Sequence, residues 1–151
     1  MTRVEFFFNV DDKLAKTSEL CEKALAKGRE LMVFTPGVAM NEAVQAALWQ
    51  HSATSFLASS DHAALMPHSP ITVSHEPEGL SKDDVLINLH DQHPPFFSRF
   101  RYLVELVGSS DEDKSAARLK FRFLPRPWLR HQIHRCARLG RVSYRLAISA
   151  W

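Results

Sequence analysis

Residues 3–37, RVEFFFNVDDKLAKTSELCEKALAKGRELMVFTPG, determine the fold class of this 151-residue chain. Residues 3–10 are a short, nearly continuous apolar run rich in β-prone residues, which predicts a buried strand. Residues 11–28 predict a helix that Asp11 and Asp12 start and Gly28 stops. Residues 29–37 predict a second strand that ends in a Pro-Gly turn. The apolar face of the helix contains Leu14, Leu20, Cys21, Ala24 and Leu25.

Strand-like and helical segments continue to alternate after residue 37. Residues 40–50 predict a second helix, and 109–123 predict a late helix capped by Ser110 and Asp113. The second helix has an apolar side made of Ala43, Ala46, Ala47 and Trp49. Further strands are expected at 53–59, 70–76, 83–91 and 100–108, with a loop over 59–70 and a turn or short helix over 94–100. This order predicts three layers, α/β/α, with a mostly parallel (mixed) sheet covered on both faces.

The composition suits one globular domain, because 45% of the residues are hydrophobic and ten of them are phenylalanines. No uninterrupted apolar run approaches about 18 residues, which argues against a membrane span, and the N-terminus turns acidic too soon for a signal peptide. Cys21 and Cys136 form neither a disulfide framework nor a zinc pattern. We expect a soluble, reduced, cytoplasmic protein without direct membrane contact.

The charge is divided unequally along the chain. Residues 1–113 hold all seventeen acidic residues and nine of the nineteen basic ones, so this part carries −8. Residues 114–151 hold the other ten basic residues and no acidic residue. A basic segment of this kind indicates a nucleic acid or an acidic protein as the partner.

Several catalytic and ligand-binding patterns are missing. The turns NVDDKLAK (9–16) and TPGVAMNE (35–42) lack the glycines and the Lys-Ser or Lys-Thr pair that hold phosphates. His90 with His93, or His131 with His134 and Cys136, could share a metal, but further ligands are lacking and surface histidines explain both groups. Cys21 falls on the apolar face of a helix, and no Gly-x-Ser-x-Gly motif occurs. We therefore expect no catalytic residue, no cofactor and no metal.

Two patterns suggest binding surfaces instead. The first consists of four residues of the late helix: Lys114, Arg118, Phe121 and Arg122. Offsets of four and three residues align side chains on one helix face, and three cations around a ring suit an acidic peptide that ends in an apolar side chain. The alternative is an ordinary solvated face with Phe121 in the core. The second pattern, Trp49 with Phe56, belongs either to the core or to a two-ring patch that docks a partner helix.

The chain resembles one family, the chi subunits of the bacterial DNA polymerase III holoenzyme. The resemblance lies in VEFFFNV (4–10), EAVQAALWQHSATSFLAS (42–59), DDVLINLHDQHPPFFSRFRYLVELV (83–107) and DEDKSAARLKFRF (111–123). It covers most of residues 1–123, and its specificity comes from the serial match of ALW, SF, DVLINL and the closing basic helix.

This resemblance implies a Rossmann-like α/β fold without a phosphate-binding loop, and a non-catalytic adaptor of the replisome. Such a subunit pairs with the psi subunit, which ties it to the clamp-loader complex. It also holds the acidic C-terminal tail of single-stranded-DNA-binding protein, whose last residue is Phe, so its contact with DNA is mainly indirect. Lys114, Arg118, Phe121 and Arg122 match the family's tail-binding positions. Trp49 and Phe56 match an aromatic pair associated with psi and with an accessory helicase that competes for chi.

The resemblance stops after Phe123, which divides the chain into a chi-type domain (1–124) and an atypical basic segment (125–151). Pro125 and Pro127 break any helix or central strand. A shift of reading frame at a T run before residue 125 explains the change, because the shifted codons can give the family's ending. Trp128 supports this hypothesis. Its only codon is TGG, and the Leu codon that follows begins with C or T. In the shifted frame, the last two bases of TGG and that next base must encode Gly.

Resequencing the gene across the T run tests the frame hypothesis, and a shorter run would restore the family ending. If the segment is real, we expect residues from about 125 onward to be poorly packed, because a final edge strand has been replaced.

Two other classes of function stay open from the residues alone. A nucleic-acid-binding protein would use the basic C-terminal segment and would bind bare DNA with an affinity that falls steeply with salt. A nucleotide-dependent α/β enzyme would show ligand-dependent melting.

Overall fold

The computed structural model describes residues 2–51, 59–60, 69–77, 82–123 and 130–135. Its strands are β1 (Arg3–Val10), β2 (Leu31–Phe34), β3 (Ser59–Ser60), β4 (Ile71–Ser74), β5 (Val85–Asn88), β6 (Tyr102–Gly108) and β7 (Arg130–Arg135). Its helices are α1 (Lys13–Ala26), α2 (Val38–Gln50) and α3 (Asp111–Phe123), with one turn of 3₁₀ helix at Phe97–Arg99.

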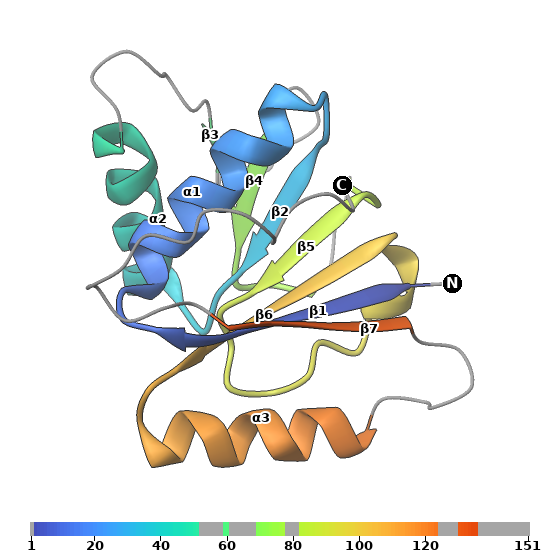
Figure 1. The fold of residues 1–151 in the computed structure, drawn as a ribbon. Coiled ribbons are helices and arrows are strands. Elements are labelled where there is room, and N and C mark those ends of the chain that lie inside the picture. The colour runs from blue at the N-terminus through green and yellow to red at the C-terminus, as the bar shows by residue number, and fades with distance from the viewer. Residues whose placement is uncertain (1, 52–58, 61–68, 78–81, 124–129, 136–151) are drawn as a thin grey trace.

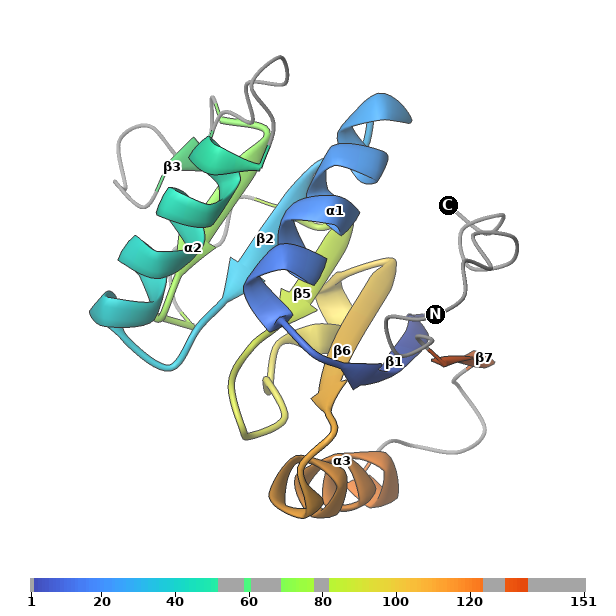
Figure 2. The same ribbon diagram turned by 60° about the vertical axis from the view of Figure 1, so that its left-hand side comes forward.

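The seven strands form one sheet in the order β3-β4-β2-β5-β6-β1-β7. Every strand pairing among the described residues is parallel, which agrees with the expectation of a mostly parallel sheet. Helices α1 and α2 cover one face of the sheet and α3 covers the other (Figures 1 and 2). The predicted three-layer α/β/α class is therefore confirmed.

Alternate residues of the strands face two separate cores. Phe7 and Val10 of β1 pack with buried residues of α1 and α2, whereas Val4 and Phe6 pack on the side of α3. The larger core includes Leu20, Cys21 and Ala24 of α1, as the helical periodicity predicted, together with Val44 and Leu48 of α2. The strands β2 and β5 are buried along their whole length, which accounts for their continuous apolar sequences.

Local signals fix the ends of the helices. The Asp12 carboxylate accepts hydrogen bonds from the backbone N–H groups of Leu14 and Ala15, at 3.0 and 3.1 Å, and so caps α1. Gly28 ends that helix with a φ of +71°, in the left-handed region that glycine adopts at little cost. At the start of α3, the Ser110 hydroxyl accepts a bond from the N–H of Asp113, as the capping prediction requires.

The capping pair is incomplete, however. The Asp113 carboxylate accepts from the N–H of Gly108, at 3.1 Å, rather than from Ser110, and it also pairs with Lys13 at 3.1 Å. A Cβ atom at Gly108 would meet the end of the Asp113 side chain, so a larger residue there would require this carboxylate to shift.

Three sequence expectations need correction. The buried side of α2 is formed by Asn41, Val44 and Leu48, not by its alanines. The short strand β3 begins where a loop over 59–70 was expected, and residues 53–58 of the predicted strand lie outside the described part. Residues 130–135 form β7 and pair with β1 from Arg3 to Phe8, so the expected loss of the edge strand is wrong for this segment.

Among the described helices, none is both long and apolar enough to cross a membrane.

Candidate functional site

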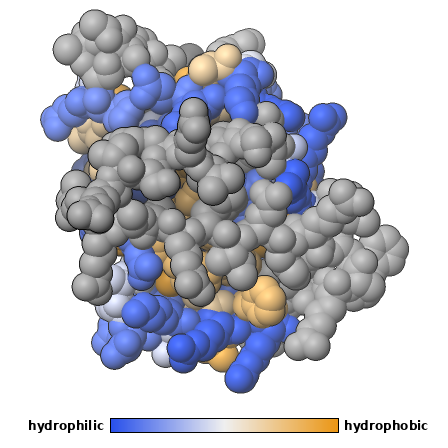
Figure 3. Space-filling model, in the orientation of Figure 1, coloured by the Kyte–Doolittle hydropathy of each residue, from blue (hydrophilic) through white to orange (hydrophobic). Residues whose placement is uncertain are grey.

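The outer surface of α3 presents most of the predicted tail-binding residues. Arg118 and Arg122 are exposed, Lys114 is partly exposed, and Phe121 keeps 40% of its surface accessible. In Figure 3, hydrophilic residues form a band over α3 at the lower edge of the molecule, with an apolar patch just above it. The structure thus places cations and an aromatic ring on one surface of α3. We call this set of four residues the α3 surface.

Phe121 lies at the boundary between core and solvent. Its ring centroid is 5.8 Å from that of Phe6 on β1, with the two planes tilted by 60°. Phe6 is fully buried and stacks on Phe8 at 6.0 Å. One side of the Phe121 ring is therefore fixed by aromatic packing, and the accessible part can contact an apolar group of a partner. The alternative that places Phe121 in the core therefore holds for only one side of the ring.

A fourth cation of α3, Lys120, points into the protein. Its ammonium group donates to Glu105 Oε2 on β6 at 3.0 Å and to the carbonyl oxygen of His90 at 2.6 Å. Burial raises the pKa of the Glu105 carboxyl above its ordinary value, while the nearby Lys120 opposes that shift. The sequence reasoning missed this pair. Two signals were available: an acid inside the buried strand YLVELVG, and the offset of three residues between Lys120 and the buried Ala117.

Asn88 completes this buried network. Its side-chain amide donates to Glu105 Oε1 at 2.9 Å and to the carbonyl of Gln92 at 3.1 Å, and its oxygen accepts from the N–H of His90 at 3.0 Å. Asn88 belongs to the DVLINL segment, so this segment has a structural role in joining β5, β6 and the loop that follows β5.

The histidines after β5 pack against aromatic rings. The His90 ring stacks on Phe34 with centroids 5.4 Å apart, and its Nδ1 lies 2.7 Å from Asp91 Oδ1. The His93 ring packs on Phe97 at 4.4 Å, and burial, followed by the charge of Lys120, lowers its pKa. No group of three or more His, Cys, Asp or Glu residues arranged for a metal occurs among the described residues. His131, His134 and Cys136 fall outside the described side chains.

The second predicted patch is only half described. Trp49, in the last turn of α2, has 62% of its surface exposed, which favours the interface interpretation over the core. Phe56 lies outside the described residues. Helix α2, which carries Trp49, and helix α3 cover opposite faces of the sheet (Figure 2).

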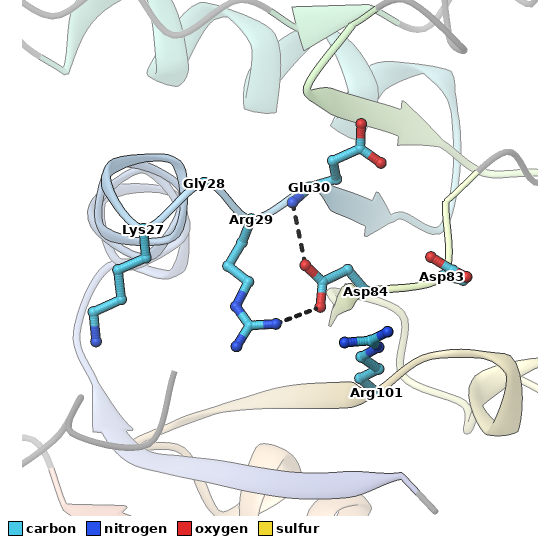
Figure 4. A pocket seen from close by; sticks show the side chains of 7 residues that line it. All are labelled: Lys27, Gly28, Arg29, Glu30, Asp83, Asp84 and Arg101. Atoms are coloured by element: carbon cyan, nitrogen blue, oxygen red, sulfur yellow. Dashed lines mark hydrogen bonds and ion pairs between the residues drawn. The ribbon is translucent and has the colours of Figure 1, made fainter.

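An open pocket of about 620 Å³ lies where α1 ends and where β5 and β6 begin (Figure 4). Three cations and three acids line it together with Gly28: Lys27, Arg29, Arg101, Glu30, Asp83 and Asp84. Arg29 pairs with Asp84 at 3.1 Å, and Lys82 pairs with Glu30 at 3.3 Å. The three cations and three acids of the lining balance in formal charge, so net charge gives the pocket no preference for an anion or a cation.

Chemistry at the buried thiol is also unfavourable. Burial raises the pKa of Cys21 to about 12, so this thiol stays protonated and unreactive at neutral pH. Asp12 occupies the start of α1, where a nucleotide-binding fold would place a glycine near phosphate, and its carboxylate already caps the helix.

Comparison with known proteins agrees with the geometry. The family model described as "DNA polymerase III chi subunit, HolC" matches residues 1–126. The protein named "DNA polymerase III subunit chi" from Pseudomonas aeruginosa is 30% identical over 144 residues, covering 92% of this chain and 100% of that protein. The chain therefore belongs to the chi subunit family of DNA polymerase III, whose members are accessory, non-catalytic subunits.

Proposed function

We propose that the chain is a non-catalytic adaptor of the DNA polymerase III holoenzyme in DNA replication. It links the clamp-loader complex, through the psi subunit, to the acidic C-terminal tail of single-stranded-DNA-binding protein. The observation that carries this proposal is the α3 surface, where exposed Arg118 and Arg122 flank the half-exposed Phe121. The contact with DNA is indirect, and the site of action is the cytoplasm.

The two kinds of side chain on the α3 surface have different physical roles. Exposed ion pairs contribute about 0–1 kcal/mol each and weaken with salt, so the cations mainly attract and orient an acidic tail. The ring of Phe121 is already packed on Phe6 and loses little freedom on binding. It is suited to cover the terminal Phe of the tail, which supplies the desolvated part of the contact.

Capture on immobilised single-stranded-DNA-binding protein tests the tail contact. We expect the full-length partner to retain the chain at low salt, and the partner without its acidic tail to lose it. Retention that is independent of the tail would contradict the proposal. If retention then requires bare DNA and falls steeply with salt, a nucleic-acid-binding function replaces it.

The surface around Trp49 is proposed as the psi-binding site, which the accessory helicase shares. Replacing Trp49 with alanine is expected to weaken psi binding by about tenfold, because exposed aromatic anchors often contribute more than 1 kcal/mol to an interface. Isothermal titration with psi measures the change. Val38→Ala is the matched control, since Val38 is 57% exposed but lies at the other end of α2, about 16 Å away. Equal affinities for the Trp49 variant and wild type would remove Trp49 from the psi site.

A further inference from the structure

We propose that Lys120 is a positioning residue for the α3 surface. By holding the last turn of α3 against β6 and the loop after β5, it keeps Phe121 and Arg122 turned outward together. The inference rests on the proposed function, because it concerns the same surface. Lys120 does not itself contact the partner, since its ammonium group lies beneath α3 and is bonded there to protein groups.

Two acceptors set the position of the Lys120 ammonium group. Glu105 Oε2, on β6, and the carbonyl of His90, after β5, accept its hydrogen bonds at 3.0 and 2.6 Å. Glu105 is 2% exposed, and its other oxygen is held by Asn88 at 2.9 Å. Asn88 also bonds both His90 and Gln92, so one side chain fixes both of the acceptors that Lys120 uses.

The sequence position of Lys120 makes this anchor important for the neighbouring residues. Successive residues of an α-helix point about 100° apart, so fixing Lys120 inward determines the directions of Phe121 and Arg122. The last turn of a helix also has carbonyl groups without intrahelical partners and is the turn that frays most easily. Phe121 alone is a partial anchor, because it is 40% exposed and packs on Phe6 at one side only.

The test is the double variant Lys120→Met/Glu105→Leu, which removes both buried charges and keeps side chains of similar size. Replacing a buried ion pair with apolar residues is often neutral for stability, so we expect a folded protein by circular dichroism. Titrated with a fluorescent acidic peptide that ends in Phe, it should bind about fivefold more weakly, because Phe121 and Arg122 must now be ordered on binding. Wild-type affinity in the folded double variant would overturn the positioning role.

Salt dependence separates positioning from direct contact. The double variant keeps Lys114, Arg118 and Arg122, so its affinity should fall with salt at the wild-type rate. A shallower fall would show that Lys120 is itself a contact and would overturn the proposal. If the double variant does not fold, Asn88→Ala keeps both charges and frees Glu105 and the His90 loop. It should bind about twofold more weakly, and wild-type affinity would again overturn the role.

The variant Arg122→Glu is titrated with the same peptide. Charge reversal at Arg122 tests whether the α3 surface binds the acidic peptide at all, and it should weaken peptide binding severalfold. If this variant and the double variant both bind like wild type, the tail-binding function fails and the inference fails with it. If only Arg122→Glu weakens binding, the function stands and the positioning role of Lys120 is wrong.

Discussion

Replacing Lys120 alone with methionine is expected to lower the free energy of unfolding by about 3–5 kcal/mol at neutral pH, the cost of leaving one partner of a buried ion pair uncompensated. The Glu105 carboxylate, which is 2% exposed, would keep its bond from Asn88 but lose the ammonium group that pairs with it at 3.0 Å. The carbonyl of His90 would lose its donor as well. Urea denaturation followed by circular dichroism measures the change.

Lys114→Met is the matched control for this prediction. Lys114 lies on the same helix and carries the same charge, but its side chain is partly exposed, so the expected change is within about 0.5 kcal/mol. If both variants lost the same free energy of unfolding, the buried Lys120–Glu105 pair would contribute no more to stability than an exposed lysine.

The pH dependence gives a second check. Burial already raises the pKa of Glu105, and loss of Lys120 raises it further. A carboxyl whose pKa is higher in the folded than in the unfolded chain stabilises the fold when it is protonated. This stabilisation is complete below the unfolded pKa of about 4.5 and is lost as pH rises through the folded pKa. Protonated Glu105 needs no cation, so the penalty of Lys120→Met should shrink as pH falls through the raised folded pKa and should be smallest below about pH 4.5. A penalty that stays constant between pH 7 and pH 4 would exclude charge burial as its cause.

Local signals explain what the sequence predicted about the fold. Asp12 and Gly28 bound α1 because their side-chain chemistry and backbone freedom act within a few residues. The buried strands were found because both of their faces are covered, which leaves a continuous apolar run. Alternation of such runs with helices was enough to predict three layers. Strand order was not predictable, because it depends on pairings such as Val85 with Tyr102 that no local pattern encodes.

The difference between local signals and long-range pairings also decides which residues of the candidate site could be predicted. Helical spacing placed Arg118, Phe121 and Arg122 on the outside of α3, and their exposure agrees with it. Lys120 was missed because its partners come from β6 and from the loop after β5, far away in sequence. Strand β7 was missed for a similar reason: Arg130–Arg135 pairs with β1, and its polar and basic residues, which follow Pro125 and Pro127, gave no strand pattern. Whether residues 125–151 are native or frame-shifted stays a prediction for resequencing.

Reversing two charges of the α3 surface together, in Arg118→Glu/Arg122→Glu, should weaken binding of the acidic tail peptide by about 30-fold, or about 2 kcal/mol. Each reversal removes an attraction of up to about 1 kcal/mol and replaces it with a repulsion of similar size. Both arginines are exposed and neither forms an ion pair with another residue of the described part of the chain, so the reversal should leave the fold intact. Fluorescence anisotropy at low salt measures the affinity, and the difference should diminish as salt screens the charges.

The control must separate local contact from the overall charge of the protein. Lys27→Glu/Arg101→Glu changes the net charge by the same amount, at exposed positions that line the pocket where α1 ends and β6 begins. If steering by net charge were the cause, both variants would weaken binding alike. If the tail lies against α3, only the Arg118 and Arg122 variant loses affinity, because screened charges act within about 10 Å at 0.1 M salt. Equal loss would place the tail elsewhere and would leave Phe121 without a partner to cover.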